Sequence, residues 1–208
     1  MLRQYVRDFF TGLKVPIEVI DDIMSDITAR YGEQGRFYHT LTHIEDFLQI
    51  LVSHENITRD PVSLILASIF HDIVYDTKKS DNEEKSAAFA AETLTQMNMQ
   101  GDVIRKITNL IISTKKHLPF DDSIDSKLFL DGDLAILGAE TKKYLIYSKS
   151  IREEYSWVSE KDYKKGRKNV LEQFLLRESI YYTEEFKNNS GDKARINIQN
   201  EIQGLNQP

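Results

Sequence analysis

An apolar stretch from Pro61 to Asp76 ends in an adjacent histidine and carboxylate, His71 and Asp72. Its sequence, PVSLILASIFHDIVYD, has almost no polar face, so we expect a helix buried on most sides, with Asp60 as its N-cap. Burying an unpaired carboxylate is costly, and the usual remedies are a partner cation, a metal ion or protonation. The sequence therefore predicts that another part of the chain meets Asp72.

Two other segments place polar groups inside apolar runs. Upstream, YHTLTHI holds His39 and His43, and downstream, LDGDL holds Asp131 and Asp133. Imidazole and carboxylate groups together suit first-row divalent ions, and two of each leave positions open for water or substrate. A buried ion pair, or a contact of the histidine with the end of its helix, is the alternative interpretation.

The order of these groups, each on its own helix, resembles the HD superfamily of metal-dependent phosphohydrolases. Uncharacterised bacterial HD proteins carry Y-H-x-x-x-H-I, F-H-D-x-V-Y and D-x-D-L-x-x-L-G, which are similar to residues 38–44, 70–75 and 131–138 here. The resemblance implies an all-α, single-domain helical bundle with the metal site between central helices. The ligands that it implies are His43, His71, Asp72 and Asp133.

Within each pair, the context selects one residue. His43 is preferred to His39 because the family's ligand begins a helix and is followed by apolar residues. Asp133 is preferred to Asp131 because it directly precedes Leu134, as the family's terminal aspartate does. Asp131 is then expected to orient the ligands.

The resemblance also implies one divalent transition metal, manganese, iron, cobalt, nickel or zinc, with magnesium as a further candidate. HD enzymes with more metals have extra histidines between the His-Asp pair and the last aspartate, whereas here His117 alone lies in that interval. We therefore expect one ion.

The implied activity is phosphoester hydrolysis on a nucleotide or another small phosphorylated metabolite. Asp72 would orient the attacking water. Arg36, Lys115 or His117 would steady the phosphate, and action as an acid is the other role open to His117. A surface charge for Arg36 and a solvated loop histidine for His117 remain alternatives. Other residues expected to contact substrate or support the ligands are Tyr38, His39, Asp76, Glu83, Glu84, Lys115, Asp131, Arg152 and Tyr155.

Some of these residues have simpler explanations. Acids such as Glu83 and Glu84 are favoured in the first turn of any helix, and Arg152 also fits a solvated charge pair. Two other functions stay open: a sensor that binds metal and nucleotide without turnover, and a di-iron oxygenase of the same fold.

Apolar residues at helical spacing predict helices throughout and no strand. The expected helices are Leu2–Leu13, Pro16–Tyr31, His43–His54, Pro61–Asp76, Glu83–Met97, Val103–Thr114, Lys127–Leu137, Thr141–Tyr155, Ser159–Glu178 and Lys193–Leu205. Loops are expected at 32–42, 115–125 and 188–192. We expect one domain over residues 1–208, with a core of about 16–178 and a C-terminal helical extension of about 179–208.

The amino-acid composition limits the classes of partner and binding site that we expect. The net charge of −6 argues against general nucleic-acid binding, and the absence of cysteine excludes disulfides and thiolate zinc sites. No apolar run approaches the roughly 20 residues of a membrane span, so we expect a cytoplasmic protein without a membrane partner. The amphipathic terminal helices offer a face for a homodimer. The motifs of serine hydrolases, P-loop proteins and Rossmann folds are absent from the sequence.

Overall fold

The computed structural model describes residues 2–207, and over this range the expected all-α fold is confirmed: ten α-helices, no strand. The helices are α1 (Leu2–Gly12), α2 (Ile17–Tyr31), α3 (Leu41–Ser53), α4 (Pro61–Phe70), α5 (Asn82–Gln96), α6 (Gly101–Ser113), α7 (Ile124–Asp133), α8 (Thr141–Glu154), α9 (Glu160–Leu175) and α10 (Glu184–Leu205). A 3₁₀ helix, η1 (Leu134–Gly138), continues α7. None of the helices in the described range is long and apolar enough to cross a membrane.

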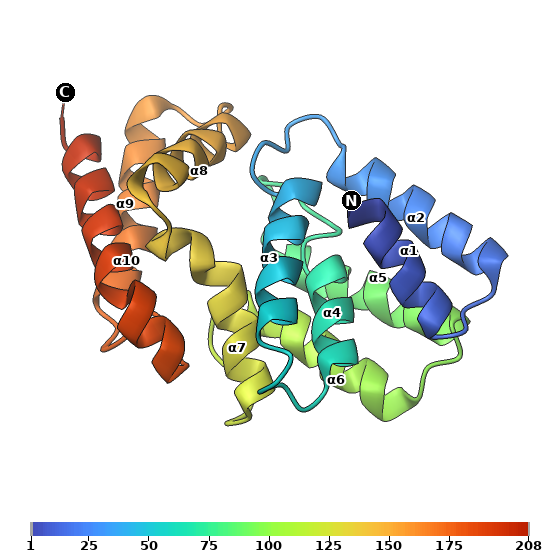
Figure 1. Cartoon of the computed structure of the whole chain (residues 1–208). Coiled ribbons are helices and arrows are strands. Elements are labelled where there is room, and N and C mark those ends of the chain that lie inside the picture. The colour runs from blue at the N-terminus through green and yellow to red at the C-terminus, as the bar shows by residue number, and fades with distance from the viewer. Residues whose placement is uncertain (1, 208) are drawn as a thin grey trace.

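Helix α4 lies at the centre of the molecule. It packs against α3, α5, α6 and α7, while α1 and α2 lie at one end and α8, α9 and α10 at the other (Figure 1). All its residues from Ser63 to Phe70 are buried, as the apolar sequence predicts. Asp60 caps it as expected, because its side chain accepts the Ser63 N–H.

The predicted extension of α4 to Asp76 is wrong: the helix ends at Phe70, and the chain turns just where the His-Asp pair lies. Side chains from other segments replace the helical hydrogen bonds. Ser86 Oγ accepts the Val74 N–H at 3.1 Å, and Arg36 donates to the carbonyl of Ile73 at 3.1 Å. These long-range contacts cannot be seen in a local apolar pattern.

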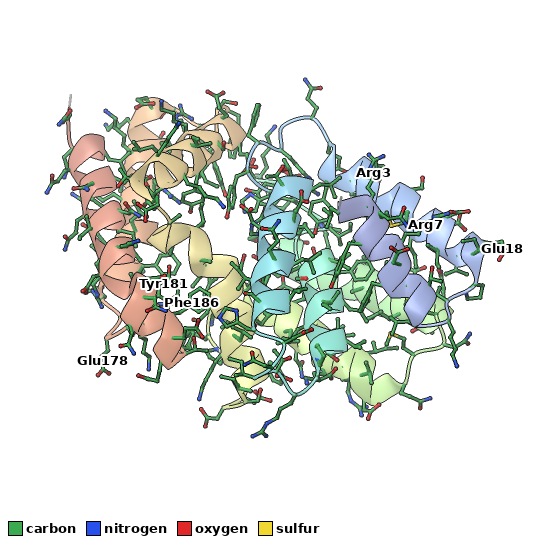
Figure 2. All side chains as sticks on the ribbon, in the orientation of Figure 1. Arg3, Arg7, Glu18, Glu178, Tyr181 and Phe186 are labelled. Atoms are coloured by element: carbon green, nitrogen blue, oxygen red, sulfur yellow. The ribbon has the colours of Figure 1, made fainter. Side chains whose placement is uncertain are left out.

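The predicted loop at 188–192 is also wrong, because α10 runs through it without a break. The helix begins at Glu184, directly after its N-cap Thr183 and nine residues before the expected Lys193. Tyr181 and Phe186, labelled in Figure 2, pack together at the start of α10 with their ring centroids 5.4 Å apart. Helix α10 also packs against η1, α8 and α9, so tertiary contacts outweigh the weak helix propensity of NNSGD.

Gly138 ends η1 where α10 passes closest. A Cβ at this position would lie 2.8 Å from the carbonyl oxygen of Ser190 and 2.8 Å from Tyr181 Oη. We expect Gly138→Ala to lower the free energy of unfolding by about 1–3 kcal/mol, because backbone must move to admit the methyl group. Urea unfolding measures this effect. Gly204→Ala is the control, since a Cβ there meets nothing within 4 Å; equal losses in both variants would contradict the packing argument.

Candidate metal centre

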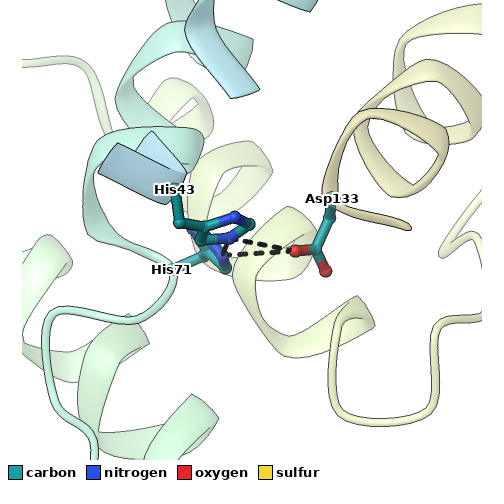
Figure 3. A group of neighbouring side chains, drawn as sticks. All are labelled: His43, His71 and Asp133. Carbon is teal, nitrogen blue, oxygen red and sulfur yellow. Dashed lines mark hydrogen bonds and ion pairs between the residues drawn. The ribbon is translucent and has the colours of Figure 1, made fainter. Parts of the chain in front are cut away.

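Three helix ends bring two histidines and one carboxylate together. His43 lies in the first turn of α3, His71 directly follows α4, and Asp133 is the last residue of α7. The Nε2 atoms of His43 and His71 are 3.2 Å apart, and each lies 3.4 Å from Asp133 Oδ1 (Figure 3). These residues form a buried group that could hold a metal ion.

The spacing of the three donor atoms fits a first-row divalent ion. An ion about 2.0–2.2 Å from each donor holds neighbouring donors about 3.0–3.4 Å apart. His71 Nδ1 donates to the carbonyl of Ser68 at 2.9 Å, which leaves the lone pair of Nε2 facing the other two donors. A carbonyl partner of this kind is the usual orienting contact of a metal-bound histidine.

Asp72 stands beside this group, as the sequence predicts. Its Oδ2 lies 2.9 Å from His71 Nε2 and 3.8 Å from His43 Nε2. Burial alone would raise the pKa of Asp72, but the neighbouring imidazoles of His71 and His39 outweigh it and lower that pKa. Burial likewise opposes the low pKa of Asp133, which the hydrogen bonds of His117 and His43 produce. Without a metal ion, the neighbouring imidazoles thus keep both acids ionised.

His117 reaches the same site from the loop after α6. Its Nε2 lies 3.3 Å from Asp133 Oδ2, and its ring packs against Phe174. The backbone of His117 has a φ of +47°, a conformation that costs free energy for a non-glycine residue. Tyr182 and Arg177 both donate to the carbonyl of His117 and hold this turn.

Glu154 is an important residue that the sequence analysis missed. Its carboxylate, fully buried, accepts the backbone N–H groups of Phe37, Tyr38 and His39 at 2.8, 2.8 and 2.9 Å. Its other oxygen meets His39 Nδ1 at 2.7 Å and the Tyr75 hydroxyl at 2.9 Å. Glu154 therefore fixes the turn that precedes α3 and positions the His39 ring, whose Nε2 lies 4.0 Å from Asp72 Oδ2.

A signal for Glu154 was present in the sequence. Glu154 lies between Arg152 and Tyr155, both of which are expected from the sequence to contact the substrate or support the ligands. Arg152, expected to contact the substrate or support the ligands, instead donates to the carbonyls of Tyr155 and Val158 at 2.7 and 3.3 Å. Arg152 does not line the cavity described below.

The donor group opens on a cavity of about 540 Å³ between the two ends of the molecule. His71, Asp72 and Asp133 form part of its wall, and α8 and α9 contribute much of the remainder. The predicted substrate-contacting residues that line it are Tyr38, His39, Glu83, His117 and Tyr155. Val170 of α9 is half exposed and also lines this cavity.

Arg36 and Lys115 are not free to bind a phosphate in the cavity. Arg36 is buried and donates to the carbonyl of Asp72 at 2.6 Å, to other carbonyls and to Glu33. Lys115 donates to the carbonyl of Ser80 at 2.7 Å and pairs with Glu84. Each cation therefore supports the chain around the site and does not line the cavity.

Two further acids lie away from the donor group. Asp131 is fully buried and accepts the Tyr182 and Thr183 N–H groups, both at 2.7 Å, so it anchors the start of α10 and does not orient a metal ligand. Asp76 is exposed and accepts the Lys78 N–H at 2.9 Å. The choice of Asp133 over Asp131 thus agrees with the donor geometry.

Comparison with known proteins adds no constraint. Neither a family model, nor a curated protein, nor a solved structure matches the chain.

Proposed function

We propose that this chain is a metal-dependent phosphohydrolase of the HD type, acting on a nucleotide or another small phosphorylated metabolite. The observation that carries the proposal is the triangle of His43 Nε2, His71 Nε2 and Asp133 Oδ1, with edges of 3.2 to 3.4 Å, at the wall of a cavity. Asp72 is the fourth ligand, and its oxygen lies 2.9 Å from His71 Nε2. Histidine and carboxylate donors with open positions are typical of hydrolytic metal sites.

In this proposal the metal ion, Asp72 and His117 have separate roles. A bound divalent ion supplies Lewis acidity and lowers the pKa of water at the site. Asp72 accepts a hydrogen bond from the attacking water and orients it. His117, which borders both Asp133 and the cavity, donates to a phosphoryl oxygen, and it takes the phosphate-binding role alone because Arg36 and Lys115 are engaged elsewhere.

Phosphate release tests the proposal. Protein reconstituted with manganese, iron, cobalt, nickel, zinc or magnesium is incubated with phosphomonoesters and phosphodiesters, and we expect release with at least one ion. Asp72→Ala is expected to lower the rate by at least about 100-fold. Asp76→Ala, a nearby exposed carboxylate outside the cavity, is the matched control and should keep wild-type activity.

Two outcomes would replace this proposal. Tight binding of metal and nucleotide without phosphate release under any ion would assign a sensor. Iron at about two ions per chain with oxygen consumption would assign an oxygenase, a class that also uses two histidines and a carboxylate at its iron.

A further inference from the structure

The cavity beside the metal centre has an unusual charge balance for a phosphate-binding site. Of its lining residues in the described range, Arg167 alone carries a permanent positive charge. That guanidinium already makes a two-point contact with Glu201, at 2.8 and 3.2 Å. The same wall carries four carboxylates, which are Asp72, Glu83, Asp133 and Asp162.

The rest of the wall is largely aromatic and aliphatic. Its aromatic residues are Tyr38, Tyr75, Tyr147, Tyr155, Trp157, Tyr163 and Phe174. Several of them contact one another or the histidines: Tyr38 lies 4.9 Å from His43 and 4.6 Å from Tyr147, between ring centroids. The aromatic surface therefore begins at the metal donors and continues along the cavity. A volume of about 540 Å³ is enough for a ligand with an organic body of aromatic size.

We infer from this wall that the substrate carries one phosphate group on an aromatic body, an inference that rests on the proposed function. A single phosphate is neutralised at the metal centre. A second phosphate further along the cavity would lose its hydration against carboxylates and aromatic rings, without a free cation among the described lining residues to compensate. An aromatic body binds more favourably because the cavity buries its apolar surface and the tyrosine rings stack on it. Nucleoside di- and triphosphates and small polar phosphates are therefore poor ligands.

Trp157 gives a binding signal that does not depend on turnover. It is the only tryptophan in the sequence, it lines the cavity, and its Nε1 donates to Thr77 Oγ1 at 2.8 Å. Its ring is half exposed. A ligand that fills the cavity will change the environment of this indole, so its fluorescence reports occupancy directly.

The test titrates zinc-reconstituted protein with non-hydrolysable phosphonates and follows the Trp157 fluorescence. Phenylphosphonate is expected to bind at least about tenfold more tightly than methylphosphonate, with cyclohexylphosphonate between them. Benzene-1,4-diphosphonate, which adds one anionic group to the same ring, is expected to bind at least about tenfold more weakly than phenylphosphonate. Equal affinities for the phenyl and methyl compounds, or tighter binding of the diphosphonate, would overturn the inference.

A charge added to the cavity provides the matched variant. Val170→Arg places a cation in the wall, and because Val170 is half exposed the change is compatible with folding. It is expected to abolish the tenfold penalty of the diphosphonate. Leu176→Arg adds the same charge just after α9 at an exposed position outside the cavity, and should leave both affinities unchanged. If Leu176→Arg also abolished the diphosphonate penalty, the overall charge of the protein, and not the cavity wall, would set the preference for one phosphonate group.

Failure of this inference and failure of the proposed function have different signatures. Phosphonate binding with the expected order but no phosphate release from aryl phosphates would remove the hydrolase and keep the aromatic ligand. Phosphate release that is equal for methyl, phenyl and polyphosphate esters would keep the hydrolase and remove the specificity.

Discussion

Replacing Asp133 by asparagine is expected to reduce the metal content of the purified protein from about one ion per chain to less than about a tenth. The amide has nearly the shape of the carboxylate but lacks its charge, and it replaces a donor that lies 3.4 Å from both histidine Nε2 atoms. Even the loss of a group that only supports a ligand weakens metal binding by about 10 to 100-fold, so the loss of a ligand should exceed that. Plasma mass spectrometry of protein purified without added metal measures the content.

Asp131→Asn is the control two residues away. This carboxylate binds the Tyr182 and Thr183 N–H groups and the Thr183 hydroxyl, all at 2.7 Å, and points away from the donors. Its loss is expected to lower the free energy of unfolding by about 1–3 kcal/mol while the metal content stays at the wild-type level. If both variants lost metal to the same degree, general loosening of α7 would explain the result better than the removal of a ligand.

Replacing Glu154 by alanine is expected to have the largest effect on stability. The change leaves three backbone N–H groups, the Tyr75 hydroxyl and His39 Nδ1 without their shared acceptor in a buried place. Removing one partner from a buried charged network costs about 3–5 kcal/mol. At about 2–4 °C per kcal/mol for a chain of this size, the melting temperature should fall by about 10 °C in a thermal scan.

Two further variants, Glu153→Ala and Glu154→Gln, test whether the hydrogen bonds of Glu154 cause the loss of stability. Glu153→Ala removes an exposed carboxylate from the same turn of α8 and should change the melting temperature little. Glu154→Gln keeps one acceptor oxygen for the three N–H groups and should fall between alanine and wild type. A melting temperature of Glu154→Ala within about 2 °C of Glu153→Ala would contradict the role of the network.

The ionisation of Glu154 is expected to make the free energy of unfolding depend on pH. Burial raises the pKa of Glu154, but the hydrogen bond and charge of His39 and the backbone N–H groups hold it at about 2, below its usual 4.5. The stabilisation is therefore present above the unfolded pKa and is lost as the pH falls through the folded value. It amounts to about 3 kcal/mol. The difference in unfolding free energy between wild type and Glu154→Gln should shrink between about pH 5 and pH 2; a constant difference would contradict the assignment.

The sequence predicts the elements more reliably than their ends. The pattern from Pro61 predicts a buried helix correctly, but nothing local shows that Ser86, Asn82 and Arg36 bind the backbone beyond Phe70 and stop it there. The prediction of a loop at NNSGD is wrong because tertiary packing adds a helix there. This segment packs on Gly138, and that packing holds residues of low helix propensity in α10.

Ligand types are likewise easier to predict than supporting contacts. Polar groups inside apolar segments indicate a buried polar site, the resemblance to HD proteins implies His43, His71, Asp72 and Asp133 as its ligands, and the structure brings these four together. Arg36 and Glu154 instead act on backbone atoms of segments distant in sequence. Sequence alone does not say whether such a charge faces a substrate or a carbonyl group.

The three donors come from helix ends that are far apart along the chain, at residues 43, 71 and 133. An unfolded chain must close two long loops before they meet, and loop closure costs conformational entropy. An ion that binds all three acts as a reversible cross-link between these loops, and its binding free energy adds to that of folding. The three donors therefore meet only when α3, α4 and α7 have assembled, and an ion bound by them would hold that assembly closed.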